Sequence, residues 1–299
     1  MKKMMVLFLL LILVSCSGGD FKESRTFIGN KVVDVDTLNL GKQVYTEYCM
    51  ACHGVKGDGN GVAAKGSFPT PRNFKQGLYK FGYVADGGLP TDADFHRIIK
   101  NGLKGTAMLT WALSDRQIDA VTQYIKTFAP QVWQNKDGVV GTPIEFTADP
   151  FTLARKDYAI SRGKEVYHFV ANCQTCHRAY IDHTEFDALN KKINGETAVT
   201  TFDEDMYKVK LQESEYVYFD SKDRFAQFAP PDFTHHSVRS AQTVEELYKR
   251  ISSGVTGTGM PAWKGTLEEG DVWAVAYYVR SLMDLNGSPK RKEFMEKIK

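Results

Sequence analysis

Apolar residues recur at helical spacing in several stretches of the chain. The first stretch predicts a helix at 40–53, whose apolar residues are spaced by four: Leu40, Val44, Tyr48 and Cys52. Four further stretches combine this spacing with a start signal, a Ser or Thr followed three residues later by an acid or Gln: 91–102, 114–130, 243–254 and 266–283. The pattern predicts an all-α fold with long loops between the helices.

The helical pattern and the motifs between the helices occur twice. Three motifs repeat in the same order: Gly-Lys-x-Val-Tyr at 41–45 and 163–167, a Pro loop ending in Phe at 71–74 and 230–233, and Gly-Thr-x-Met-x-x-Trp at 105–111 and 257–263. Self-similarity over more than a hundred residues predicts two copies of one domain.

The N-terminus has the pattern of an export signal. Lys2 and Lys3 precede an apolar run at 4–14, which is too short to span a bilayer comfortably. The run ends in Leu-Val-Ser-Cys, which resembles the bacterial lipobox, so Cys16 is the expected lipidation site and mature N-terminus. An ordinary cleaved signal and a retained anchor helix remain as alternatives. The lipobox interpretation places the protein on the periplasmic side of a bacterial membrane.

These signals together predict the organisation of the chain. The expected segments are a signal peptide at 1–15, a lipid-anchored tether at 16–36, a first domain at 37–132, a linker at 133–157, a second domain at 158–288 and a basic tail at 289–299.

Composition narrows the functional class. The 299 residues include 38 Lys and Arg against 36 Asp and Glu, so no basic excess favours nucleic-acid binding. Only the N-terminal run is apolar enough to enter a membrane, which excludes a protein with many spans.

Four of the five cysteines form two Cys-x-x-Cys-His motifs, the attachment signature of c-type haem. Their residues are Cys49, Cys52 and His53 in the first motif and Cys173, Cys176 and His177 in the second. Each thiol pair suits two thioether bonds to one porphyrin, and the adjacent histidine is the expected proximal iron ligand. A zinc ribbon would bring both pairs to one metal, whereas these lie about 120 positions apart. A redox dithiol or structural disulfides would not need the histidines. The motifs predict two covalently bound haem c groups.

Both halves resemble the class I cytochrome c domain, over roughly residues 38–130 and 158–285. The first half is also similar to cytochrome c subunits of bacterial respiratory complexes, through Gly-Asp-Gly at 57–59, Tyr-Lys-Phe at 79–81 and Leu-Pro-Thr at 89–91. The resemblance implies two tandem helical domains and a role in electron transfer.

The resemblance also implies the distal iron ligands. Met108 and Met260 occupy the loop before the final helix of each repeat, where the family places its axial methionine. Leu109 departs from the family, which commonly has a proline there, as Pro261 is in the second copy. The remaining histidines carry no such motif: His96, His168, His183, His235 and His236. His235 and His236 follow the second proline loop and are interpreted as solvent-facing loop residues, with competition for the iron as the alternative.

Four further residues are predicted to line the haem pockets. Trp111 and Trp263 keep the same spacing from the two methionines, and an indole there can pack on a haem edge. Pro71 and Pro230 resemble the family's proline loop, whose carbonyl orients the proximal imidazole. Either proline could equally be loop punctuation.

The second half carries an insertion at about 181–225, with eleven acidic and six basic residues. Short strands of a hairpin are predicted at 209–211 and 216–218. The insertion is interpreted as a lid over a haem edge or domain interface, with an acidic docking surface for a basic redox partner as the alternative. The basic tail is expected to be a solvated helix end.

The functional prediction is a carrier of single electrons, because an iron with six ligands has no open position for a substrate. No catalytic residue and no small-molecule substrate are expected. Redox proteins or a respiratory complex are the expected partners, and the chain itself is either a free carrier or a subunit. The competing hypothesis is a dihaem peroxidase, which needs one open iron.

Overall fold

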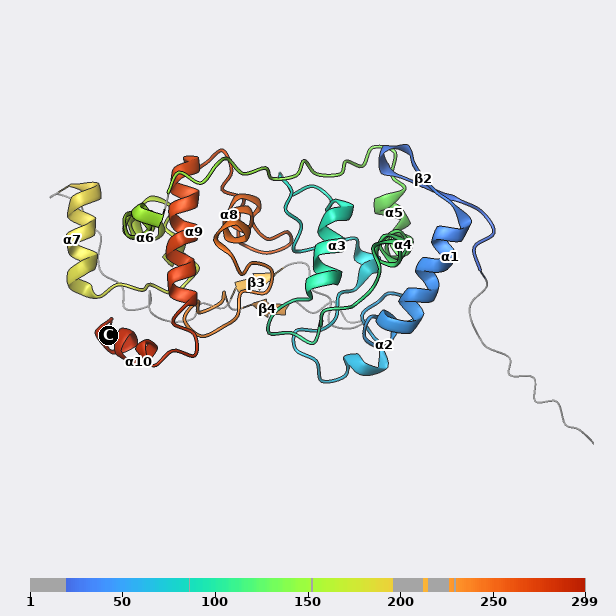
Figure 1. Cartoon of the computed structure of the whole chain (residues 1–299), viewed down its shortest axis with the longest axis horizontal. Helices are drawn as coiled ribbons and strands as arrows, with labels where there is room; N and C mark the ends of the chain where they lie inside the picture. The colour runs from blue at the N-terminus through green and yellow to red at the C-terminus, as the bar shows by residue number, and fades with distance from the viewer. Residues whose placement is uncertain are drawn as a thin grey trace, which may run out of the picture.

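The computed structural model describes residues 20–85, 87–151, 153–195, 212–214, 226–228 and 230–298. Over these ranges the chain is mostly helical, with strands only in two short antiparallel pairs, so the all-α prediction is confirmed. The helices gather into two halves that lie next to each other along the long axis of the molecule (Figure 1). Within the same ranges, no helix has the length and apolar character needed to cross a membrane.

The first half contains two short strands and five α-helices. Its elements are β1 (Arg25–Phe27), β2 (Lys31–Val33), α1 (Val35–Val44), α2 (Met50–His53), α3 (Asp92–Asn101), α4 (Asp115–Lys126) and α5 (Pro130–Trp133). The α1 helix begins earlier than the spacing predicted, because the Asp34 carboxylate caps it by accepting a 2.7 Å hydrogen bond from the Thr37 amide. A π-helical turn at Tyr45–Cys49 joins α1 to α2.

The crossing of α1 and α4 organises the first core. At Gly41 the two backbones approach so closely that an added Cβ would lie 2.1 Å from the carbonyl oxygen of Ala120. Only glycine allows this approach without a shift of one helix. Around the crossing, fully buried side chains of both helices pack together, among them Leu38, Ile118 and Val121.

The hairpin of β1 and β2 lies in the segment that was expected to be a tether. Phe27 and Val33 are buried in the first core, and the Lys31 amine contacts the Asp92 carboxylate at the start of α3 at 2.5 Å. The sequence argument missed this hairpin because three-residue strands are too short to show an alternating pattern. Residues 25–33 therefore pack on the first domain, whereas 1–19 lie outside the described residues.

The second half follows the same order of principal helices and adds two more. Its elements are α6 (Lys156–Glu165), α7 (His183–Asn194), β3 (Gln212–Ser214), β4 (Ala226–Phe228), α8 (Val244–Ser253), α9 (Glu269–Met283) and α10 (Lys290–Lys297). A π-helical turn at Val166–Val170 follows α6, as one follows α1. At Gly163 an added Cβ would lie 2.0 Å from the carbonyl oxygen of Ala274, so α6 crosses α9 as closely as α1 crosses α4.

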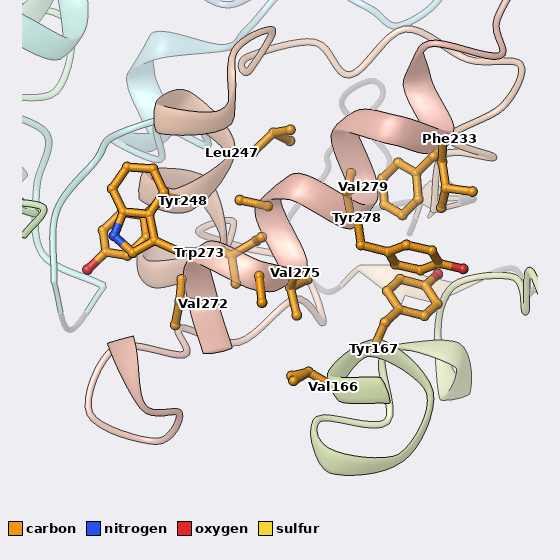
Figure 2. Packing of buried hydrophobic residues seen from close by; sticks show 14 of the residues in the cluster. Val166, Tyr167, Phe233, Leu247, Tyr248, Val272, Trp273, Val275, Tyr278 and Val279 are labelled. Atoms are coloured by element: carbon orange, nitrogen blue, oxygen red, sulfur yellow. The ribbon is translucent and has the colours of Figure 1, made fainter. Parts of the chain in front are cut away.

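Large apolar side chains fill the core of the second half. Figure 2 shows Tyr167, Tyr278 and Phe233 gathered at one end of α9, with Trp273 and Tyr248 at the other. The rings of Tyr248 and Trp273 are stacked with centroids 4.6 Å apart. Such aromatic packing supplies much of the apolar burial in a small helical domain.

Three of the four predicted capping boxes are confirmed: Thr91 with Asp94, Ser114 with Gln117, and Thr243 with Glu246. The prediction at Thr266 is wrong. The carbonyl of Trp263 accepts hydrogen bonds from the amides of Thr266 and Leu267, which holds Thr266 in a separate turn. The α9 helix consequently begins only at Glu269, without a side-chain cap.

The insertion and the tail both contain helices that pack on the second half. Lys192 and Lys164 form ion pairs of 2.5 and 2.6 Å that join α7 and α6, with Glu165 and Glu185 as their partners. In α10, Arg291 donates a 3.2 Å hydrogen bond to the Thr234 hydroxyl. The tail helix therefore packs on the second half through one face, with Phe294 and Met295 partly buried, whereas its lysines Lys290, Lys292 and Lys297 are exposed. The predicted strands at 209–211 and 216–218 lie outside the described residues, and the observed pair joins Gln212–Ser214 to Ala226–Phe228.

The segment between the halves is bound to both of them. Its backbone pairs with the first half, through 2.8 Å hydrogen bonds from Ala85 to Thr142 and from Ile144 to Tyr83. Ile144 itself is 1% exposed and belongs to the second core. The predicted linker therefore fixes the first half against the second.

Candidate functional site

A cavity of about 520 Å³ opens in the first half, and its wall is mostly apolar. Cys49, Cys52 and His53 line it from α2 and the turn before it, while Met108 and Trp111 line it from the loop before α4. Both cysteines are free thiols. The fold thus brings the predicted covalent and axial residues of the first repeat to one cavity.

The imidazole of His53 is held by the loop that follows the first motif. Its Nδ1 lies 3.0 Å from the carbonyl oxygen of Arg72, so Nδ1 carries the donated proton and Nε2 remains for an iron. Burial lowers the pKa of His53, which keeps the ring neutral as a ligand must be. Pro71 also lines the cavity, and the accepting carbonyl belongs to Arg72, the next residue of the same proline loop.

Two aromatic residues fix the position of the His53 imidazole. The ring of Phe74 stacks on that of His53, with centroids 4.5 Å apart and planes 19° apart. The Tyr45 hydroxyl donates a 2.7 Å hydrogen bond to the carbonyl of Gly54, directly after His53. The position and the plane of the imidazole are therefore fixed without any added group.

A set of local hydrogen bonds shapes the Met108 loop. The Met108 amide donates to the Thr106 hydroxyl at 3.1 Å, and that hydroxyl donates to the Leu103 carbonyl at 2.8 Å. The Leu103 amide in turn donates to the Met108 carbonyl at 2.9 Å. At Gly102 the backbone has φ +65°, and an added Cβ would lie 2.6 Å from the Met108 carbonyl oxygen. The loop is a closed turn that directs Met108 to the cavity.

The Met260 loop of the second half contains the same turn. The Met260 amide donates to the Thr258 hydroxyl at 3.2 Å, and that hydroxyl donates to the Val255 carbonyl at 2.8 Å. The Val255 amide donates to the Met260 carbonyl at 3.1 Å, and Gly254 has φ +63°. Met260 and Trp263 both pack, partly buried, against the second core.

The second motif shares the aromatic contacts of the first, but the buried Nδ1 of His177 has no hydrogen-bond partner among the described residues, whereas that of His53 has one. Phe233 stacks on the ring of His177 with centroids 4.9 Å apart, and the Tyr167 hydroxyl donates a 2.8 Å hydrogen bond to the carbonyl of Arg178. Burial lowers the pKa of His177 to about 4, and the Pro231 backbone opposes this shift. Cys173 and Cys176 are free thiols, and Cys173 packs partly buried against the second core.

The other histidines in the described ranges are engaged elsewhere or exposed. His168 is fully buried: its Nδ1 lies 2.8 Å from the Lys164 carbonyl, and its Nε2 accepts a 3.2 Å hydrogen bond from the Tyr180 amide. Its pKa is lowered to about 3 by burial, so it is a neutral structural residue. His235 and His236 lie exposed on the loop after Phe233.

The described residues contain no cluster of three or more His, Cys, Asp or Glu that suits a bare metal ion. Sequence reasoning assigned no role to Phe74 and Phe233, although both end the repeated Pro loop and could have been found from it. It also missed Arg72 as the acceptor for His53, because that choice depends on the backbone conformation of the loop.

Comparison with known proteins supports the haem interpretation of the first site. The family described as Cytochrome c matches residues 38–129. A solved chain of the reducing HAO-like protein complex of Kuenenia stuttgartiensis is similar to this chain, with 27% identity and a TM-score of 0.56. The likeness covers 81% of this chain and 95% of the solved one. No curated protein matches the chain. These likenesses support a c-type cytochrome with covalently bound haem.

Proposed function

We propose that this protein is a dihaem electron carrier, with one haem c in each half and His-Met ligation at both irons. The observation that carries the proposal is the repetition of the ligand frame, meaning the His-Phe stack and the Met turn, in both halves. The stacks of His53 on Phe74 and of His177 on Phe233 differ by only 0.4 Å in centroid distance and 2° in plane angle. Two Met loops with the same three hydrogen bonds accompany them.

The first cavity fits a haem by the chemistry of its wall. Two free thiols in one turn are placed for two thioether bonds, and a neutral imidazole with its Nδ1 proton already donated leaves Nε2 for the iron. Haem supplies a one-electron couple, and His-Met ligation favours the reduced state. The chain contributes burial, orientation of the imidazole and a preformed methionine turn.

The carrier function follows from the ligand frame. With a His and a Met assigned to each iron, no position is left at which peroxide could bind, so the frame favours electron transfer over peroxidase chemistry. Two haems in one chain would pass electrons between partners one at a time. The buried contacts between the halves would hold the two groups at a constant separation.

The partner proposed is a larger oxidoreductase complex. The solved chain similar to this one belongs to a complex described as reducing and HAO-like, and it is matched over nearly all of its length. We propose a subunit role of this kind, on the periplasmic side of a membrane and anchored through Cys16. The acidic insertion at 181–225 is proposed to be a lid over a haem edge or the domain interface, or a docking surface for a basic partner.

The proposal is tested by counting the covalently bound haems and assigning each of them to one cysteine pair. Intact mass of the denatured protein should exceed that of the processed chain by two haems. Replacing Cys173 and Cys176 by Ala should remove one haem, and replacing Cys49 and Cys52 should remove the other. A wild-type mass with one haem would reject the second site. Rapid carbon monoxide binding by one reduced haem of the unmutated protein would reject six-coordination and favour the peroxidase hypothesis.

A further inference from the structure

Four cationic side chains line the first cavity: Lys65, Arg72, Lys80 and Arg239. They come from distant parts of the chain, because Arg239 belongs to the second half. Burial lowers the pKa of Lys80 to about 7, and the nearby guanidinium groups of Arg72 and Arg239 add to this shift. Like charges gathered at one apolar cavity are costly unless an anion is bound there.

The two carboxylates at the cavity wall are engaged with groups other than Arg72 and Arg239. Asp94 lines the wall, but its oxygens accept from the amides of Tyr83 and Thr91 and contact the Arg97 guanidinium. Asp58 also lines the wall, where its carboxylate accepts a 3.1 Å hydrogen bond from the Asn60 amide. Among the described carboxylates, none forms an ion pair with Arg72 or Arg239.

The backbone around Arg239 is fixed against the first half. The Arg239 carbonyl accepts a 3.2 Å hydrogen bond from the Lys104 amide, in the same loop as Met108. The next carbonyl, that of Ser240, accepts a 2.6 Å hydrogen bond from the Tyr83 hydroxyl. With its backbone held on both sides, Arg239 is a built part of the cavity wall.

A second buried arginine strengthens this interface. Arg250, 4% exposed, donates from the second half to the carbonyls of Gly82 and Phe81 at 3.2 and 3.0 Å, and to the Ser240 hydroxyl at 3.1 Å. These bonds join the residue after Arg239 to the segment after Lys80. The spacing between the two cations is thus set by a network of backbone contacts.

We propose that Arg239 of the second half, together with Arg72, binds the propionate carboxylates of the haem attached in the first half. This rests on the proposed haem at Cys49 and Cys52. A haem carries two carboxylates, and guanidinium groups bind carboxylates with two parallel hydrogen bonds. The second half then completes the first haem site. The redox potential of the first haem consequently depends on how the two halves pack together.

The test measures the midpoint potential of the first haem in the full-length, haem-loaded protein. A Met260→His background lowers the potential of the second haem and so separates the two redox waves. Arg239→Gln should lower the first potential, because loss of a nearby cation favours the ferric state. A tenfold change in the redox equilibrium, about 59 mV for one electron, is the expected upper size. Arg239→Lys should restore most of the wild-type value.

The matched control is Arg280→Gln, which removes the same charge from the same half at an exposed ion pair with Asp284. Equal potentials in Arg239→Gln and Arg280→Gln would overturn the proposal, as would an equal shift in Arg239→Gln and Arg239→Lys. If Arg239→Gln loses the first haem while Arg239→Lys and the control keep it, the proposal is supported. Loss in both Arg239 variants would indicate a packing role and overturn it.

A second arm separates the haem carboxylates from a free anion. Titration of the unmutated holoprotein with inorganic phosphate should leave the potential and the spectrum of the first haem unchanged, because the cations are already occupied. A saturable shift that disappears in Arg239→Gln would assign the cluster to a free anion and overturn the inference. Absence of any haem at Cys49 and Cys52 in the wild type would instead reject the proposed function itself.

Discussion

The carbonyl oxygen of Ala120 lies where a side chain at Gly41 would begin. A Cβ at Gly41 would stand 2.1 Å from that oxygen, and a Cβ at Gly163 would stand 2.0 Å from the carbonyl oxygen of Ala274. The two helix crossings, α1 with α4 and α6 with α9, therefore both require a residue without a Cβ. A third helical glycine, Gly270 near the start of α9, has nothing within 4 Å of its Cβ position.

This contrast gives a stability prediction. Gly41→Ala and Gly163→Ala should each lower the free energy of unfolding by about 1–3 kcal/mol, the usual cost of overpacking a close contact. Gly270→Ala should leave it unchanged or raise it by up to about 1 kcal/mol, because alanine is the better helix former. Urea unfolding of the three holoproteins measures the difference. Equal stabilities for all three would contradict the crossing geometry.

Much of the fold follows from local sequence. The boxes at Thr91, Ser114 and Thr243 could be predicted because each cap joins residues three apart, within one turn. The two ligand sets could be placed because the motifs repeat in order. Thr266 misled the prediction because the carbonyl of Trp263, three residues earlier in the same loop, accepts a hydrogen bond from its amide and holds it in a turn before α9.

Other missed features depend on distant contacts. The docking of α10 requires Arg291 to reach Thr234, and no pattern within the tail indicates that partner. Likewise, the position of Arg239 in the first cavity follows from Tyr83 and Lys104, which lie more than a hundred residues away in sequence. Hydrophobic periodicity indicates which residues share a helix face, but it does not indicate which loops contact each other.

A buried ion-pair cluster predicts how acid affects the first half. Asp92 contacts the amines of Lys126 and Lys31. Burial alone would raise the pKa of Asp92, but the two amines outweigh it and lower the value to about 2, below the ordinary 3.8. A carboxyl with a depressed folded pKa stabilises the fold above its unfolded pKa. That stability should be lost as pH falls from about 4 to about 2.

Asp92→Asn tests this cluster. The variant should be less stable at pH 7, because Lys126, 3% exposed, loses its counter-charge. Its stability should also fall less steeply than that of the wild type between pH 4 and 2, measured by thermal unfolding at each pH. Asp115→Asn is the control, since Asp115 forms only an exposed ion pair with Lys100. Parallel pH profiles for the wild type and Asp92→Asn would contradict the prediction.

Membrane attachment gives a prediction outside the described residues. If Cys16 is the lipidated N-terminus, Cys16→Ser should block lipidation and leave the precursor unprocessed by the lipoprotein pathway. Each buried acyl CH₂ contributes about 0.8 kcal/mol, so an unmutated protein with two or more chains should stay with membranes after a salt wash. Mass spectrometry of the N-terminal peptide checks the modification. Normal maturation and membrane fractionation of Cys16→Ser would reject the lipobox.

The two methionine turns differ at one position, and this predicts unequal ligand bonds. The turns share their hydrogen bonds, but Met108 is followed by Leu109, 64% exposed, where Met260 is followed by Pro261. Proline restricts the unfolded loop, so its absence should leave the Met108 bond easier to displace. The sulfur-to-iron band of the oxidised protein should therefore disappear in two steps as alkali or denaturant is raised.

Leu109→Pro should move the earlier step toward the later one, by about 0.4–1 kcal/mol if the backbone accepts proline. Met108→Ala should remove the earlier step and let the first haem bind carbon monoxide when reduced. Met260→His should keep the second haem six-coordinate at a lower potential. A single step in the wild type would show that the loop residue after methionine does not set the strength of the bond. An earlier step that survives in Met108→Ala would show that this step does not belong to the Met108 bond.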